Sequence, residues 1–385
     1  MVTVLILILL MVLCLLPFVP GLLEASRRTD TRPLRIVHAS EVNIRHLARG
    51  FRQTLEREIL PLLSRITPQG TLERGELNDG SRWLAAGRPL TAAELADEGN
   101  GAGCVTVLAS GVDLELADGG TYLAEIYGAG HVHGGPRTVC RAVLAEGDLH
   151  LGRESITLRW LHAGGRLHAG TGTVLFGRAS SDQDLTLEEG CRFERLQAPT
   201  IAFGISGEPG PEPSTGNLPG EDRLLNPDDL DKPVQRDGRR WLIRGHLEIP
   251  AERLLEADIV CTGKLTIGRG TVLRGAVKAR KQLVLEDNVI LDGGAVCEHD
   301  LIVGRHCRIK GPVVAEGLVQ LGYGTVVGLL EAPTTVSAAT IRCEPGVDCH
   351  GTVWAHQVGD VLLPDPEEPT LAPGAADTEN EKGAA

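Results

Sequence analysis

The amino-acid sequence predicts an all-β fold: a triangular β-helix, that is, a solenoid with coils of about 18 residues, preceded by an N-terminal transmembrane helix and a juxtamembrane amphipathic helix. Three observations predict the β-helix. Apolar residues recur at every sixth position, related phrases recur at every eighteenth, and the chain has 48 glycines against 5 Phe, 4 Trp and 3 Tyr. A thin aliphatic column suits this composition, because aromatic rings are too wide for it.

The six-residue period runs through the second half of the chain. Steps of six from Ile249 reach only apolar residues: Leu255, Cys261, Ile267, Leu273, Ala279, Leu285, Leu291, Cys297, Val303, Ile309, Ala315, Leu321 and Val327. Neither the 3.6-residue period of a helix nor unbroken two-residue alternation gives this spacing, so the chain must turn after each hexad. The predicted core and assembly residues are Ile249, Leu265, Ile267, Leu273, Leu283, Leu285, Leu291, Leu301, Val303, Ile309 and Leu321.

A longer period groups the hexads into coils. Related phrases begin at every eighteenth position, at Leu247, Leu265, Leu283 and Leu301, and the same spacing occurs earlier in the chain at Leu149, Leu167 and Leu185. Three hexads return the chain to its start, one strand spacing of about 4.8 Å higher. The sequence therefore predicts two β-helix segments, residues 103–205 and 241–358.

Residues 1–24 are predicted to form a transmembrane anchor. The run from 2 to 23 has no ionisable side chain except the thiol of Cys14, and its length suits a hydrocarbon core of roughly 30 Å. A cleaved signal peptide is the competing interpretation, but no basic residue precedes the run. Basic residues favour the cytoplasmic side. We therefore expect a single-pass protein of the inner (cytoplasmic) membrane with the bulk of the chain in the cytoplasm, because four membrane-proximal arginines follow the span: Arg27, Arg28, Arg32 and Arg35.

Residues 36–66 are predicted to form an Arg-rich amphipathic helix with Ser40 as its N-cap. Its apolar positions are Ile44, Leu47, Phe51, Leu55, Ile59 and Leu62. Two roles remain open. Arg45, Arg49 and Arg52 could contact anionic lipid headgroups, or the helix could cap the β-helix that follows.

Two further segments are predicted to lie outside the repeat. Residues 206–240 contain six prolines and many acids, so we expect an insertion or linker there. Residues 359–385 are acidic and poor in apolar groups, and we expect a disordered tail.

The phrases "LTIGRGTVLRGAVKA" and "LIVGRHCRIKGPVVAEGLVQLGYGTVVGLLEA" resemble the bactofilins, a family of polymer-forming bacterial cytoskeletal proteins. The resemblance covers roughly residues 247–332 and, less clearly, 143–205. It implies a compact β-helix that polymerises end to end without nucleotide and recruits envelope or cell-wall machinery at the membrane. The expected partners are other copies of the chain, the membrane and envelope or cell-wall enzymes. The chain departs from the family pattern in its length and its interrupted repeat.

Hexapeptide-repeat enzymes, such as acyltransferases or carbonic-anhydrase-like proteins, are the alternative. They need a histidine base or a cluster of three zinc ligands. His150 and His168 are separated by one full coil and should stack on adjacent coils, with His162 one corner away, all facing solvent. His131 and His133 have the spacing to chelate from one strand face, but no third partner is evident. We expect no catalytic, cofactor-binding or metal site.

Charge and cysteine use limit the partners and the compartment. The net charge of -13 and the few aromatic rings argue against nucleic acid, which needs basic residues and stacking rings. The nine cysteines fit a reducing compartment, where they remain small buried groups. Cys261 and Cys297 fall two coils apart in the inward series, too far apart to form a disulfide.

Overall fold

The computed structural model describes residues 44–78, 80–91, 94, 105–204 and 223–363, together with Met11 and Leu16. The chain divides into two units, Met1–Asn43 and Ile44–Ala385. Apart from Met11 and Leu16, the predicted anchor lies outside the described residues, as do Ser40 and the four membrane-proximal arginines Arg27, Arg28, Arg32 and Arg35. Within the described residues, no helix is long and apolar enough to cross a membrane.

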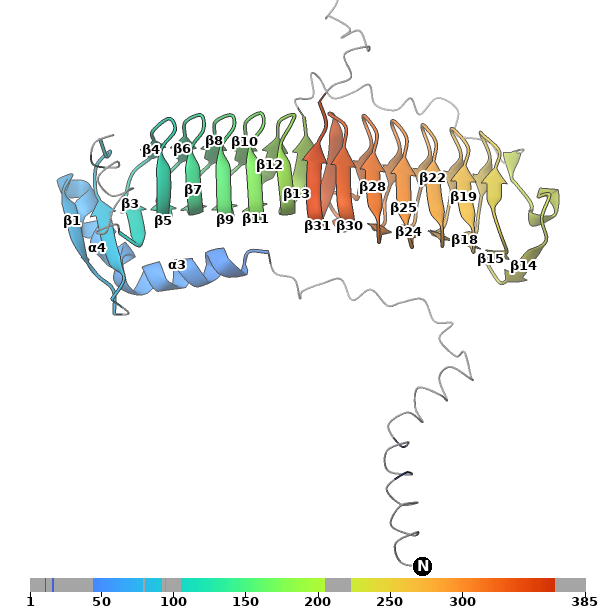
Figure 1. The fold of residues 1–385 in the computed structure, drawn as a ribbon, viewed down its shortest axis with the longest axis horizontal. Helices are drawn as coiled ribbons and strands as arrows, with labels where there is room; N and C mark the ends of the chain where they lie inside the picture. The colour runs from blue at the N-terminus through green and yellow to red at the C-terminus, as the bar shows by residue number, and fades with distance from the viewer. Residues whose placement is uncertain are drawn as a thin grey trace, which may run out of the picture. The chain divides into compact units, whose positions relative to one another are not determined.

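The second unit is an all-β solenoid of about 13 coils, each of about 18 residues, and this confirms the predicted β-helix (Figure 1). All of its described strands belong to one continuous sheet. Neighbouring coils pair in parallel, so equivalent residues of successive coils lie side by side. The aliphatic core inside this sheet runs through both repeat segments.

The second repeat segment has three short strands in most coils. Strand β16 pairs with β19, β17 with β20 and β18 with β21, and the pattern continues along the column. Its strands are β16 (Leu247–Ile249), β17 (Leu254–Leu255), β18 (Asp258–Cys261), β19 (Lys264–Ile267), β20 (Val272–Leu273), β21 (Val277–Ala279), β22 (Gln282–Leu285), β23 (Ile290–Leu291), β24 (Ala295–Cys297), β25 (Asp300–Val303), β26 (Arg308–Ile309), β27 (Val313–Ala315), β28 (Leu318–Leu321), β29 (Val326–Val327), β30 (Thr334–Cys343) and β31 (Val347–Val361).

The first repeat segment alternates short and long strands. The short strands stack on one side, and each long strand covers the remaining two sides, with a bulge where the register shifts. Its strands are β3 (Val107–Ser110), β4 (Leu114–Leu116), β5 (Thr121–Gly128), β6 (Val132–Gly134), β7 (Val139–Ala145), β8 (Leu149–Leu151), β9 (Ile156–Ala163), β10 (Leu167–Ala169), β11 (Val174–Ser181), β12 (Asp184–Leu187) and β13 (Arg192–Phe203).

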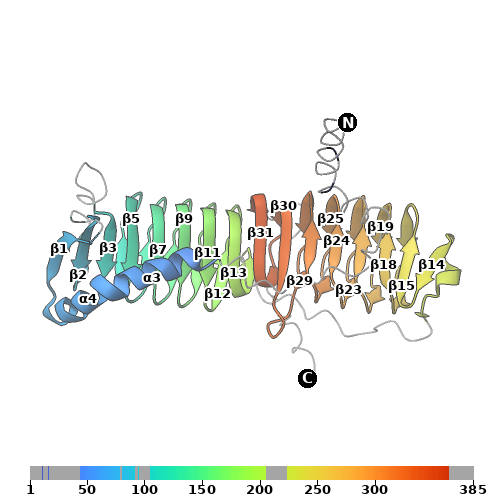
Figure 2. The ribbon, with the colours of Figure 1, turned by 90° about the horizontal axis from the view of Figure 1, so that it is seen from below.

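The two segments meet at their C-terminal ends. Strand β13, the last of the first segment, pairs antiparallel with β31, the last of the second (Figures 1 and 2). The ladder covers all three sides of the coil, from Arg192 opposite Asp360 to Phe203 opposite Val347. We call this contact the seam. Since β31 extends to Val361, the prediction that residues 359–385 are a tail is wrong for its first residues; residues 364–385 lie outside the described part.

Each outer end of the column finishes in an antiparallel hairpin. At the first end, β1 (Leu72–Glu76) pairs with β2 (Arg82–Ala86), and β2 continues into the parallel sheet through β3. At the second, β14 (Val234–Asp237) pairs with β15 (Arg240–Ile243), which joins β18. The 3₁₀ turn η4 (Pro227–Asp229) lies next to this hairpin in the chain. Residues 223–240 are therefore part of the fold, which corrects the predicted insertion or linker for that part of 206–240; residues 206–222 lie outside the described residues.

Helices α3 (His46–Glu58) and α4 (Leu60–Ile66), followed by the 3₁₀ turn η2 (Thr67–Gln69), pack against the first segment. The apolar side of α3 lies along the side of the column, over β5, β7 and β9 (Figure 2). Phe51 packs on Trp160, with ring centroids 5.6 Å apart. The N-cap is Arg45, with no side-chain cap, so Ser40 as N-cap is wrong, and α3 covers a side of the column rather than its end.

The seam requires a glycine opposite a phenylalanine. A Cβ atom on Gly359 would lie 2.2 Å from Phe193 Cε2, and Phe193 is itself buried against Phe203 with centroids 5.4 Å apart. Gly359→Ala should therefore lower the free energy of unfolding by about 1–3 kcal/mol through overpacking. Chemical denaturation of the full chain measures this change.

Gly50→Ala is the matched control. Gly50 lies inside α3, and its Cβ would meet nothing within 4 Å, so this change should stabilise the chain by about 0.5–1 kcal/mol through helix propensity. A Gly359→Ala protein as stable as the wild type would contradict the seam packing.

Candidate functional site

The predicted core and assembly residues all point into the column. Ile249, Ile267, Leu285, Val303 and Leu321 form one in-register row. The remaining members, Leu265, Leu273, Leu283, Leu291, Leu301 and Ile309, lie in the two neighbouring rows and are also buried. Their side chains stabilise the coils and do not reach a partner directly, so their role in assembly stays a prediction.

Three histidines form a stacked row on the outer side of the short strands. His133, His150 and His168 are in register on β6, β8 and β10. Successive ring centroids are 4.6 Å apart, and the planes differ by 4° and 2°. Val132 pairs with Leu149, so this coil is one residue shorter than the period of the repeat. A strict period therefore does not align His133 with His150.

The surroundings of the middle ring, His150, disfavour its protonation. Burial lowers the pKa of His150, and the neighbouring His168 and His133 lower it further. His168 Nε2 lies 3.1 Å from Glu188 Oε1. Burial raises the pKa of Glu188, but hydrogen bonds from Thr171 and the charge of His168 outweigh it, so this pKa lies below its usual value.

The row is not arranged to hold a metal ion. Parallel stacked rings direct their nitrogens side by side, whereas a zinc site needs them to converge at about 2.0–2.1 Å from one ion. His131 does not join His133, because its Nδ1 accepts a hydrogen bond from Asp148 N at 2.9 Å. Within the described ranges, no three His, Cys, Asp or Glu residues are placed to share a metal ion.

His162 is buried, which corrects the prediction that it faces solvent. It is 4% exposed, close to the start of α3. Its Nδ1 lies 3.0 Å from Ser180 Oγ and its Nε2 3.8 Å from Asp182 Oδ2. Asp182 is also the partner of Arg45. Burial lowers the pKa of His162 to about 4; the charge of Asp182 opposes this shift, and the nearby arginines add to it. This contact ties the start of the helix to the column.

A second ion pair fixes α3 further along the column. Arg52 makes a bidentate contact with Glu146, through Nε at 3.0 Å and Nη2 at 2.7 Å. Arg45 and Arg52 therefore pair with the solenoid in this structure, in place of the lipid headgroups considered from the sequence.

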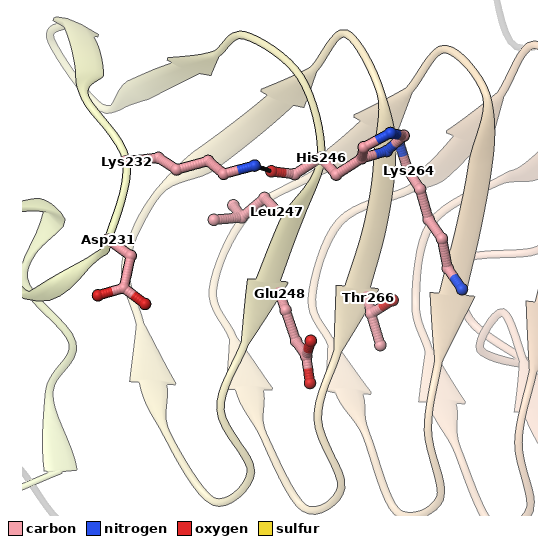
Figure 3. A pocket seen from close by; sticks show the side chains of 7 residues that line it. All are labelled: Asp231, Lys232, His246, Leu247, Glu248, Lys264 and Thr266. Carbon is pink, nitrogen blue, oxygen red and sulfur yellow. Dashed lines mark hydrogen bonds between the residues drawn. The ribbon is translucent and has the colours of Figure 1, made fainter.

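An open hollow lies near the outer end of the second segment (Figure 3). Its volume is about 340 Å³. Lys232 donates a hydrogen bond to the carbonyl of His246, and Lys264 N donates one to His246 Nδ1 at 2.9 Å. His246 is thus engaged and is not placed to act as a base through Nδ1. The lining residues are Asp231, Lys232, His246, Leu247, Glu248, Lys264 and Thr266.

The cysteines are placed as core groups rather than nucleophiles. The seven that the structure describes are free and buried. Burial raises the pKa of Cys140 to about 11 and those of Cys191 and Cys307 to about 12, so few of these thiols ionise near neutral pH. Cys261 and Cys297 lie on alternate coils with Ala279 between them.

Two surface features were not found from the sequence. Leu123, Leu158 and Phe176 are 51%, 44% and 47% exposed at the bulges of the long strands. The ladders shift register at these positions, and a fixed period does not reveal such a shift. The second feature lies beside the seam and consists of Arg178 on β11, Arg195 on β13 and Trp354 on β31.

Comparisons with protein-family models, with curated proteins and with solved structures gave no match. The fold and the geometry of the described residues are therefore the basis for the functional proposal.

The buried His162 should make stability depend on pH. Its pKa is about 4 in the folded chain against an ordinary 6.5, so the unfolded chain binds the proton more readily. Stability is then fully present above pH 6.5 and falls as the pH drops towards 4. Between pH 7 and 4.5, wild type should lose about 1–2 kcal/mol more than His162→Gln.

Urea unfolding of the full chain at both pH values measures this difference. His299→Gln, at an exposed position, is the matched control and should keep the wild-type dependence. If His162→Gln and wild type lose equal stability on acidification, His162 is not held neutral under the helix.

Proposed function

We propose that this chain is a noncatalytic scaffold, similar in its repeat to the bactofilins, that is attached to a membrane and recruits partner proteins along its sides. One observation carries the proposal: the repeat forms a single closed column whose free surface is almost entirely lateral. About 13 coils at a spacing of about 4.8 Å give a column roughly 60 Å long. Such a surface offers a long row of repeated positions to other proteins.

The ends of the column favour lateral over end-to-end contacts. The bactofilin resemblance implies end-to-end polymerisation, but the last coil of each segment is paired within the chain through the seam. The outer strands β1 and β14 are short and carry charged side chains, among them Glu73 and Glu76 on β1 and Arg236 and Asp237 on β14. Short, charged edge strands are a common device against edge-to-edge pairing. We therefore place self-association of the chain on the sides of the column.

Membrane attachment in this proposal is assigned to residues 1–24, followed by Arg27, Arg28, Arg32 and Arg35 as membrane-proximal residues on the cytoplasmic side. The juxtamembrane role first considered for α3 is replaced by packing on the column, because its apolar side is buried there. The proposed clients are envelope or cell-wall proteins, as the bactofilin resemblance implies.

The alternative, a hexapeptide-repeat enzyme, has no specific observation in its favour. His150 and His168 are stacked in a row, His162 is buried under α3, and Nδ1 of His246 is hydrogen-bonded. None of these imidazoles lies in a cleft with a nucleophile or a converging partner in the described residues.

Electron microscopy of the full chain, purified in detergent without nucleotide, tests the proposal. We expect separate rods, or rods associated side by side. Compact trimers that bind acyl-CoA or zinc in calorimetry would support the enzyme, and long end-to-end filaments would contradict closed ends.

A variant of the edge strand β14 tests whether its charges prevent end-to-end pairing of the rods. Replacing both Arg236 and Asp237 with Val removes the charges from β14 and should allow rods to join in pairs at that end, because an uncharged edge is free to extend a ladder. Rods that remain separate in this variant would show that the charges are not what keeps this end closed.

A further inference from the structure

One side of the column continues beyond the start of α3 with no described element covering it. Trp160, Arg178, Arg195, Trp354 and Ser337 are in register there, across β9, β11, β13, β31 and β30. Trp160 is buried under Phe51 of the helix. The next members of the row, Arg178, Arg195 and Trp354, are half-buried. The row therefore passes from a covered apolar surface to an uncovered cationic one at the seam.

The cationic group is held in place by stacking. The guanidinium carbon of Arg195 lies 4.6 Å from the centroid of the Trp354 ring, a cation–π contact. On the same strand, His356 lies 4.8 Å from Trp354 between ring centroids and contacts Ser337 Oγ through Nε2 at 3.2 Å. Arg195 is thus oriented before any ligand arrives, which reduces the entropy lost on binding.

Arg178 and Arg195 have no acidic partner within the described residues, although the chain carries a net charge of -13. Other arginines on this side, Arg45 and Arg52, each pair with a carboxylate. Arg178 and Arg195 are instead neighbours on parallel strands. Like charges placed directly opposite destabilise a sheet, so a bound anion would relieve their repulsion.

Three shielded polar atoms in this region also lack a hydrogen-bond partner: Arg178 Nε, Trp354 Nε1 and Gln197 Oε1. Gln197 follows Arg195 by two residues and therefore lies on the same side of β13. Shielded polar groups of this kind destabilise the fold when they are left without a hydrogen-bond partner. Two are donors and one is an acceptor, so a ligand that matches them must both accept and donate hydrogen bonds.

We propose that this group, the seam patch of Arg178, Arg195, Gln197 and Trp354, binds an extended acidic peptide segment of a partner protein. Carboxylates of the peptide pair with the arginines, and a peptide N–H donates to Gln197 Oε1. The dianion of a phosphate monoester offers acceptors alone and leaves Gln197 Oε1 unmatched. The inference rests on the proposed scaffold function, because it names the chemistry of the recruited partner.

Fluorescence anisotropy with a labelled ten-residue peptide of alternating Glu and Val, added to the full chain in detergent, tests the inference. Wild type should bind the peptide, and either Arg178→Gln or Arg195→Gln should weaken binding by about tenfold, the effect of losing one charged pair. A peptide with Gln in place of every Glu should bind at least about tenfold more weakly to wild type.

Matched variants distinguish a loss of peptide affinity caused by the patch from one caused by unfolding or by a change in net charge. Arg342→Gln removes an exposed arginine on β30 and should leave the affinity unchanged. Arg195→Lys keeps the charge but loses the planar stacking on Trp354, and it should bind with intermediate affinity. Circular dichroism establishes that each variant retains its strands.

Three results would overturn the inference: no binding to wild type, equal affinity in Arg195→Gln, or a rise of about tenfold in affinity when residues 364–385 are removed. The last would mean that the chain's own acidic tail occupies the patch. Failure here remains distinct from failure of the scaffold proposal, because separate rods in electron microscopy depend on the ends and not on this patch.

Discussion

The last coil of a β-solenoid leaves a row of backbone N–H and C=O groups without a partner, and the rest of this structure depends on how those groups are satisfied. In this chain, the backbone groups of two final coils are satisfied at the same place. The final coil of the first segment and the final coil of the second pair with each other through β13 and β31. A ladder over three sides replaces two exposed ends with one continuous core.

Antiparallel pairing at the seam has consequences for the whole column. The second segment must begin at the far end and wind back towards the first, so its N-terminal hairpin, β14 and β15, closes the outer end. The first segment is closed in the same manner by β1 and β2. Since each coil contacts only its neighbours, the seam is, among the residues that the structure describes, the place where the stability of one segment depends directly on the other. Phe193, Phe203 and Gly359 supply its packing.

The sides of the column carry the chemical variety that the core lacks. Helix α3 covers one side and is fixed by Arg45, Arg52 and the buried His162. The stacked histidines lie on another side, and the arginines beside Trp354 lie where the helix cover ends. Inward positions repeat because they must fill a constant cross-section, whereas outward positions are free to differ from coil to coil. A scaffold would use that freedom to distinguish its partners.

The solenoid could be predicted from the sequence because its core repeats: an inward residue at every sixth position and a new coil at every eighteenth place Ile267 under Leu285 and Leu285 under Val303. The seam could not be predicted, because a sequence repeat shows which coils are alike but does not show which ends of the two segments pair. The alignment of His133 with His150 was missed for a related reason, since one shorter coil breaks the period. The burial of His162 depends on a helix that is distant in the sequence, which no local pattern encodes.

Some predictions failed because composition describes solvation rather than contacts. The proline- and acid-rich stretch was expected to be an insertion or linker, yet residues 223–240 close the end of the column, and Leu225 within them and the following Trp241 lie in the core. Likewise, lipid contact was one of two roles left open for residues 36–66 because of their arginines, while in the structure Arg45 and Arg52 pair with carboxylates of the column.

Disulfide formation across the seam is the most direct test of this account. Gln197 and Thr352 lie directly opposite each other on β13 and β31, and paired antiparallel residues are within reach of a disulfide. The variant with Gln197→Cys and Thr352→Cys should oxidise to a disulfide within one chain, independent of protein concentration. The pair Gln197→Cys and Thr335→Cys, in line with Thr352 but one strand further away, should not. No bridge in the first pair, or a bridge that forms only between chains, would contradict the seam.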